Sequence, residues 1–287
     1  EKRNARVKKS GLPIIIIIIL FAFSCKQSEK NQKKGIVVLS PEVAEIICAL
    51  NAENEITGIT AECNYPPSLQ QKKRVGSFSS IDKEAIIALN PRLIFCSSLE
   101  QESIALDLKN LGFQVEVIYP ESINAMFSDI ERIGTLIRRK EAAGKLVKDL
   151  KEEREKIKAN SQGKLRPKVY LEIYRNPLMS VSDSSFVGEL IETAGGDNIF
   201  PRLERDYARI NPEAVISAKP DIMICYSQDT LENIINRKGW QNIPAIQKRK
   251  IFFEKDINPD LIQRATPRCI EGMKILAKLF EDWQKEQ

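Results

Sequence analysis

The absence of histidine narrows the chemistry of this sequence more than any other feature. It excludes Ser-His-Asp and Cys-His nucleophile systems, histidine general bases, and zinc or haem iron held by histidine. The chain also has no glycine-rich phosphate loop and no GxSxG motif. We therefore expect no catalytic residues, no metal site and no bound cofactor. An enzyme that relies on carboxylates or on a serine and lysine pair is the alternative.

Two glutamates, Glu84 and Glu213, occupy equivalent places in two similar stretches of the chain. Each is expected in the first turn of a helix, where a single acid does no more than offset the helix dipole, by about 0.3–1 kcal/mol. Two such carboxylates on one side of a two-lobed body would suit docking on the cationic sockets of a two-fold symmetric partner. We therefore predict that both are docking residues.

Aromatic residues accompany the two glutamates. Phe78 lies six residues before Glu84, and Tyr207 lies six residues before Glu213, each in an expected loop. Facing each other across a cleft, the two rings would hold a large flat ligand, and local packing is the alternative. Further contacts to the ligand are expected from Tyr65, Tyr174, Arg175, Arg209 and Arg264. For the arginines, ordinary solvated surface is the alternative.

The elements that must position these residues come as a repeated unit. DKEAIIALNPRLIFCSS, from Asp82, and NPEAVISAKPDIMICYS, from Asn211, share a capping residue, a Glu-Ala pair, an apolar helix face, a proline and an apolar strand. Strand patterns alternate with helices around both units, which favours parallel sheets covered on both faces. We infer an α/β fold of two similar lobes, residues 35–121 and 161–287, with a ligand cleft between them. Two unrelated helix and strand units are the alternative.

Residues 122–160 join the lobes, and their apolar residues keep to one helical face with no proline. The pattern predicts one long bridging helix. Gly134 and Gly144 weaken it locally. A kink or a break into two helices is therefore the alternative.

Residues 1–24 have the pattern of a signal peptide. A basic stretch precedes an apolar run from Leu12 to Phe23, which as a helix would cover about 18 Å, too little for a hydrocarbon core of about 30 Å. Ser24 and Cys25, followed by a polar run, resemble a bacterial lipoprotein cleavage site. We expect Cys25 to carry the lipid and residues 25–34 to form a tether. Ordinary secretion and an uncleaved anchor are the alternatives.

The net charge of +5 comes largely from this leader. Five basic residues and one acid precede Cys25, which leaves 39 basic and 38 acidic residues in the rest of the chain. A nucleic-acid-binding protein would keep a basic face on its folded body, so we expect no nucleic-acid partner. The other five cysteines have no CxxC spacing. Cys48, Cys96 and Cys225 lie in apolar segments and are expected to pack as small hydrophobic residues.

A resemblance to a known family rests on the order and spacing of several motifs between Gly35 and Phe280. They are LSPEVAEII, YPP, RVGSF, the Glu84 unit, the long helix, ETAGGDNIF, the Glu213 unit, and RATPR before a terminal helix. In this order they resemble the helical-backbone (class III) binding proteins of ABC importers, especially the cobalamin-binding and ferric-siderophore-binding proteins.

The resemblance implies two lobes bridged by a rigid helix, a ligand in the cleft, and a permease dimer with ATPase subunits that the paired glutamates contact. Phe78 and Tyr207 match the aromatic positions that hold cobalamin in the family, and Ser97 and Ile173 take the places of its other pocket aromatics. The protein would be an extracytoplasmic monomer, held at a bacterial membrane by its lipid anchor alone, that captures cobalamin or a ferric-siderophore-type chelate. A surface lipoprotein that binds another protein is the alternative.

Overall fold

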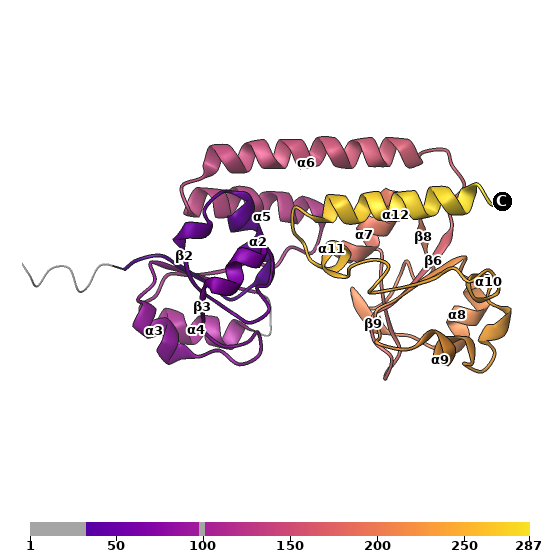
Figure 1. Ribbon diagram of the computed structural model, residues 1–287, viewed down its shortest axis with the longest axis horizontal. Coiled ribbons are helices and arrows are strands. Elements are labelled where there is room, and N and C mark those ends of the chain that lie inside the picture. The colour runs from indigo at the N-terminus through magenta and orange to yellow at the C-terminus, as the bar shows by residue number, and fades with distance from the viewer. Residues whose placement is uncertain (1–32, 98–100) are drawn as a thin grey trace, which may run out of the picture.

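The computed structural model describes residues 33–97 and 101–287 (Figure 1). The predicted signal peptide, Cys25 and most of the predicted tether lie outside the described residues. Within those two ranges, no helix is both long enough and apolar enough to cross a membrane. The described chain forms two α/β lobes that lie under a layer of long helices.

The N-terminal lobe is built on a five-stranded parallel sheet in the order β3-β2-β1-β4-β5. The strands are β1 (Ile36–Val38), β2 (Ile56–Ile59), β3 (Lys73–Arg74), β4 (Leu93–Cys96) and β5 (Val115–Val117). The helices are α2 (Pro41–Ala49), α3 (Lys83–Leu89) and α4 (Glu102–Asn110), with short 3-10 turns η2 (Glu53–Glu55) and η3 (Pro67–Gln71). Ile36 and Val38 pack in the core shared with the long helices, whereas Val37 packs in a second core with residues of α3 and α4. The sheet is therefore covered on both faces, as predicted.

The C-terminal lobe has a four-stranded parallel sheet in the order β11-β10-β6-β8. Its strands are β6 (Lys168–Glu172), β8 (Asp197–Asn198), β10 (Ile222–Cys225) and β11 (Ile251–Phe253). An antiparallel ribbon of β7 (Met179–Val181) and β9 (Tyr207–Arg209) contacts β6. The helices are α7 (Phe186–Ala194), α8 (Pro212–Ala218), α9 (Leu231–Ile235), η5 (Trp240–Asn242), α10 (Pro244–Gln247), α11 (Asp260–Gln263) and α12 (Cys269–Gln284).

The repeated unit predicted from the sequence is present in both lobes. Asp82 caps α3 by accepting a hydrogen bond from the amide of Ala85 at 2.9 Å. Asn211 caps α8 by accepting one from the amide of Glu213, also at 2.9 Å. Each helix ends at a residue in the left-handed conformation, and a proline and a buried strand follow. The prediction of two similar lobes is confirmed.

Residues 122–160 form two helices, so the prediction of one helix over this range is wrong. The helices are α5 (Ile123–Leu136) and α6 (Lys140–Ser161). The turn between them contains Arg138, which has a φ of 60°. Gly144 lies inside α6 and causes no break.

Gly134 allows the chain to reverse at this point. A Cβ atom at this position would lie 2.4 Å from the Cβ atom of Ala143 on α6. Only glycine therefore lets α5 and α6 approach so closely. The apolar periodicity does not reveal this contact because it is the same for a straight helix and for a hairpin of two helices.

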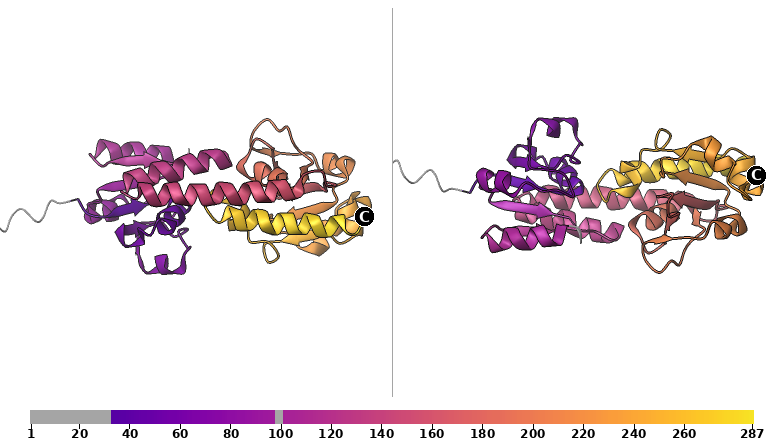
Figure 2. Two further views of the ribbon diagram at one scale, coloured as in Figure 1. Left: turned by 90° about the horizontal axis from the view of Figure 1, so that it is seen from above. Right: turned by 90° about the horizontal axis from the view of Figure 1, so that it is seen from below.

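The helix that joins the lobes is α6. In Figures 1 and 2 it runs along the molecule, over α5 at the N-terminal lobe and next to α12 at the C-terminal lobe. Its 22 residues give it a length of about 33 Å. Buried residues of both lobes and of these helices form one continuous core, so packing holds the lobes together. The predicted fold class, two parallel-sheet lobes bridged by one long helix, is confirmed.

Candidate functional site

A small cavity lies between the two lobes. Its lining includes residues that follow the carboxyl ends of β1, β4 and β5, together with residues of α7, β9 and α11. Ligands of open α/β sheets bind outside the carboxyl ends of the strands, which makes this cavity the candidate ligand site. Its volume is about 50 Å³, well below the roughly 300–1,000 Å³ typical of ligand pockets. A large ligand therefore requires the walls to move apart.

Two of the predicted ligand contacts, Ser97 and Tyr207, line this cavity from opposite lobes. Ser97 is buried, and its amide donates a hydrogen bond to Oε1 of Gln101 at 2.7 Å. Burial raises the pKa of Tyr207 to about 12. The phenol of Tyr207 therefore stays neutral at physiological pH and can donate a hydrogen bond to a ligand.

The ribbon of β7 and β9 brings further predicted contacts onto one face. Met179 pairs with Arg209 in the ribbon and with Tyr174 in an isolated bridge. Residues that lie opposite each other in antiparallel strands share a face, as do residues two apart along one strand. Tyr174, Tyr207 and Arg209 therefore lie on the same face, and the side chains of Tyr174 and Arg209 are exposed.

A second, more open hollow of about 540 Å³ lies beside this face. Arg202, Arg205 and Arg209 line it, and Tyr207 lines both this hollow and the interlobe cavity. Of these three arginines, Arg209 alone was predicted to be a ligand contact. The eight-residue run RLERDYAR contains all three arginines, and this local concentration was the signal for Arg202 and Arg205.

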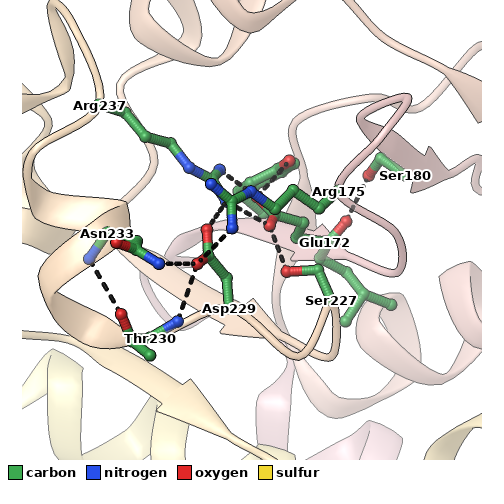
Figure 3. A network of polar contacts seen from close by, with 10 residues as sticks. Glu172, Arg175, Ser180, Ser227, Asp229, Thr230, Asn233 and Arg237 are labelled. Atoms are coloured by element: carbon green, nitrogen blue, oxygen red, sulfur yellow. Dashed lines mark hydrogen bonds and ion pairs between the residues drawn. The ribbon is translucent and has the colours of Figure 1, made fainter.

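A buried carboxylate holds Arg175 in place. The guanidinium of Arg175 forms an ion pair with Asp229 at 3.0 Å (Figure 3), and the Asp229 side chain is fully buried. Asp229 also accepts hydrogen bonds from the side chain of Asn233 and from the amide of Thr230. Burial alone would raise the pKa of Asp229, but these hydrogen bonds and that from Arg237 hold it below its ordinary value. The carboxylate therefore stays charged and orients Arg175.

The same network continues to Glu172 at the end of β6 (Figure 3). Glu172 is fully buried and accepts hydrogen bonds from Arg237 at 2.5 and 2.7 Å, and from the hydroxyl groups of Tyr170 and Ser227. Arg237 in turn donates to Asp229 at 2.9 Å. This network was not predicted from the sequence. A glutamate inside the apolar strand KVYLEIY is nevertheless a signal of a buried ion pair, because an unpaired buried carboxylate is costly.

Phe78 and Ile173, two further predicted ligand contacts, make other contacts in the structure. The amide of Phe78 donates to Glu62 at 2.8 Å, and its carbonyl accepts from Gln101 at 3.2 Å. Ile173 is partly buried and packs against the shared core. In the part of the chain that the structure describes, Phe78 is not in the cavity lining to which Tyr207 belongs. The facing pair of aromatic residues stays a prediction.

Arg264 and Tyr65 belong to a contact between the lobes, which we call the interlobe latch and define as Glu45, Tyr65, Arg264 and Arg268. Glu45, with a side chain only 3% exposed, accepts hydrogen bonds from Arg268 at 2.7 and 2.8 Å. It also accepts one from Arg264 at 3.2 Å, and Arg264 donates to Asn64 at 2.9 Å. The guanidinium of Arg268 lies 3.6 Å from the ring centroid of Tyr65. Ligand contacts by Tyr65 and Arg264 stay predictions.

We expect Glu45→Gln to lower the free energy of unfolding by about 1.5–3 kcal/mol, the range for hydrogen bonds to a charged group. The reason is that Arg268 keeps its charge and loses the Glu45 carboxylate, whereas Arg264 keeps its ion pair with Asp260. Equilibrium urea denaturation measures the change. Glu55→Gln is the control, since Glu55 pairs with two arginines at a more exposed place and should cost less than about 1 kcal/mol. Equal losses from both variants would show that the latch is no stronger than an ordinary surface pair.

Glu84 and Glu213 are exposed in the first turns of α3 and α8. The two helices lie one in each lobe, on the side of the molecule away from α6 (Figure 1). No ion pair joins either glutamate to another residue of the described ranges. Both carboxylates are thus accessible to a partner, and the predicted docking contact itself stays a prediction.

The five cysteines in the described ranges are free thiols. Cys96 and Cys225 are buried, and Cys48 is partly buried, in line with packing as small hydrophobic residues. Burial raises the pKa of Cys48 and Cys96 to about 12, and it raises that of Cys225 as well, so these thiols stay protonated. Over the residues placed in the structure, no cluster of three or more cysteine, aspartate or glutamate residues could hold a metal ion.

Similarity to known proteins covers most of the chain. A family profile described as periplasmic binding protein matches residues 36–257. The uncharacterized ABC transporter substrate-binding lipoprotein YvrC of Bacillus subtilis (strain 168) is 28% identical over 267 residues, which cover 90% of this chain and 83% of that protein. The vitamin B12-binding protein of Vibrio parahaemolyticus is 21% identical, with 96% and 98% covered. The periplasmic heme-binding protein RhuT from Roseiflexus sp. RS-1 shares the fold, with a TM-score of 0.78, 19% identity, and 88% and 100% covered.

Proposed function

The chain belongs to the periplasmic binding protein family, and on that premise we propose that it is the substrate-binding component of an ABC importer. The observation that carries the proposal is the cavity between the lobes, at the carboxyl ends of the N-terminal strands and closed on the other side by Tyr207. Similar proteins are named as ABC transporter substrate-binding and vitamin B12-binding proteins, not as enzymes. A surface lipoprotein that binds another protein would need no such cavity.

The ligand in this proposal is a metal chelate, either cobalamin or a ferric-siderophore-type complex. Tyr119 and Tyr207 in the cavity lining provide aromatic surface for a large flat ligand. A chelate of this size exceeds the cavity of about 50 Å³, so binding requires the side chains or the lobes to move apart. Because α6 and the continuous core hold the lobes together, we expect this movement to be small.

In the same proposal, residues 1–24 direct export and Cys25 carries the lipid that holds the protein at a bacterial membrane. The folded chain then acts outside the cytoplasm as a monomer and delivers its ligand to a permease dimer with ATPase subunits. Glu84 and Glu213 would contact the permease, since both are exposed on the side away from α6. This part of the proposal rests on the leader pattern and on the positions of the two glutamates.

Fluorescence titration tests the proposal, with a chain that lacks residues 1–24 and carries Cys25→Ser. Trp240 and Trp283 are buried in the C-terminal lobe, and their emission transfers energy to a coloured chelate that binds nearby. We expect saturable quenching by at least one of cyanocobalamin, ferric citrate, ferric enterobactin, ferrioxamine B and haem. If none of the five chelates binds, the chelate assignment is contradicted.

A further inference from the structure

The hollow beside Tyr207 carries an unusual concentration of positive charge. Arg202 and Arg205 come from the loop before β9, and Arg209 lies at the end of β9. Among the described residues, Glu204 is the single acid in the lining of this hollow of about 540 Å³. Three guanidinium groups and one carboxylate leave the hollow with a net positive charge.

The three arginines of the hollow differ from Arg175 and Arg264, two other predicted ligand contacts, in having no acidic partner. Arg175 pairs with Asp229, and Arg264 pairs with Glu45. In contrast, no ion pair or hydrogen bond joins the side chain of Arg202, Arg205 or Arg209 to another residue of ranges 33–97 and 101–287. Like charges gathered without an ion-pair partner repel one another, and a bound anion would relieve that repulsion.

The hollow adjoins the candidate ligand site, since Tyr207 lines both. The interlobe cavity, which Tyr207 also lines, has the opposite charge, since its lining includes Glu42, Glu121 and Asp206. A ligand that lies across Tyr207 would therefore meet acids at one end and guanidinium groups at the other. The charge asymmetry favours one orientation of such a ligand.

We propose that the hollow formed by Arg202, Arg205 and Arg209 is an anion subsite of the ligand site, and that the ligand is a ferric chelate with carboxylate or catecholate oxygens at its periphery. The inference rests on the proposed function and selects within it. Planar guanidinium groups bind such oxygens in pairs through charge-assisted hydrogen bonds. Neutral or cationic groups of the same ligand would lie over the acids of the interlobe cavity.

The test compares the wild-type protein with the triple variant Arg202→Gln, Arg205→Gln, Arg209→Gln by fluorescence titration. The probes are ferric citrate, which offers carboxylates, ferric enterobactin, which offers catecholates, cationic ferrioxamine B, and cyanocobalamin, which carries one phosphodiester. We expect the wild-type protein to prefer one of the two anionic ferric chelates. The triple variant should bind that chelate about 1,000-fold more weakly, as expected for the loss of three charge-assisted hydrogen bonds.

A matched control removes three positive charges from exposed positions on α6, by Lys140→Gln, Lys145→Gln and Lys158→Gln. This variant should bind the anionic chelate within about threefold of the wild-type protein, because these charges lie far from the hollow and are screened beyond about 10 Å. Its purpose is to separate local contacts from a general effect of net charge.

The other outcomes separate a failure of the anion subsite from a failure of the proposed function. Three outcomes would overturn the anion subsite and leave the proposed function in place. The wild-type protein could prefer ferrioxamine B or cyanocobalamin. The triple variant could bind with unchanged affinity, or it could lose the same affinity for every chelate that binds. Binding of no chelate by a folded wild-type protein would instead contradict the proposed function. Circular dichroism of the triple variant identifies a variant that has failed to fold, and in that case each single Arg→Gln variant replaces it and should weaken binding about tenfold.

Discussion

Replacing Glu172 with glutamine should lower the free energy of unfolding by about 3–5 kcal/mol, the usual cost of removing one partner from a buried ion pair. Glu172 is fully buried and accepts two hydrogen bonds from Arg237, whose side chain is 17% exposed. The variant leaves a partly buried guanidinium with Asp229 as its remaining carboxylate partner. Urea denaturation followed by circular dichroism measures the change.

The control for this prediction is Asp282→Asn on α12. Asp282 pairs with Lys278 and Lys285 at an exposed position, where ion pairs contribute about 0–1 kcal/mol. The double variant Glu172→Gln, Arg237→Gln should recover part of the loss because the guanidinium that lost Glu172 is then absent, while Asp229 keeps its ion pair with Arg175. A loss below about 1 kcal/mol for Glu172→Gln would contradict the view that this network stabilises the C-terminal lobe.

The network also supports the predicted ligand contact of Arg175, because it holds Asp229, which in turn pairs with Arg175. Removal of Glu172 should therefore weaken ligand binding in addition to lowering stability. Binding measured well below the unfolding midpoint separates the two effects. Unchanged affinity in the folded variant would show that the network is purely structural.

Reversal of both docking charges, by Glu84→Lys and Glu213→Lys, should abolish ligand uptake by cells and leave the ligand dissociation constant of the isolated protein unchanged. Both side chains are exposed in the first turns of α3 and α8. A lysine in each place would repel the cationic sockets expected on the permease, and like charges placed opposite each other at an interface cost several kcal/mol. Uptake of labelled ligand and titration of the purified variant give the two measurements.

The control reverses two exposed charges on α6, Glu141→Lys and Glu152→Lys, on the opposite side of the molecule. This variant carries the same change in net charge and should support uptake at about the wild-type rate. If uptake survives the double reversal at Glu84 and Glu213, the docking assignment is wrong. If the α6 control also abolishes uptake, the effect comes from net charge and the assignment fails as well.

Several features of the protein were predictable because their signals are local. The caps at Asp82 and Asn211, the prolines after each helix and the buried strand runs depend on residues within one unit of chain, and the structure has each of them as predicted. The parallel sheets follow from the alternation of these units. The fold class and the repeat of lobes were thus determined by the sequence itself.

The break between α5 and α6 was decided by tertiary packing. The apolar face continues through residues 122–160, and nothing in its spacing separates a straight helix from a reversal. The close contact between Gly134 and Ala143 exists only once α6 folds back over α5. Helical periodicity specifies which face is buried and leaves open which partner buries it.

The site residues depended even more on the tertiary structure. The sequence marked Arg175, Arg209 and Arg264 as similar loop cations, yet Arg175 pairs with a buried aspartate, Arg264 joins the lobes through Glu45, 219 residues away, and Arg209 faces an open hollow. Local patterns determine helices, strands and their caps because those interactions span a few residues. Which charges meet an acid and which stay available for a ligand is decided only when distant segments come together, since electrostatic pairing depends on distance in space and not along the chain.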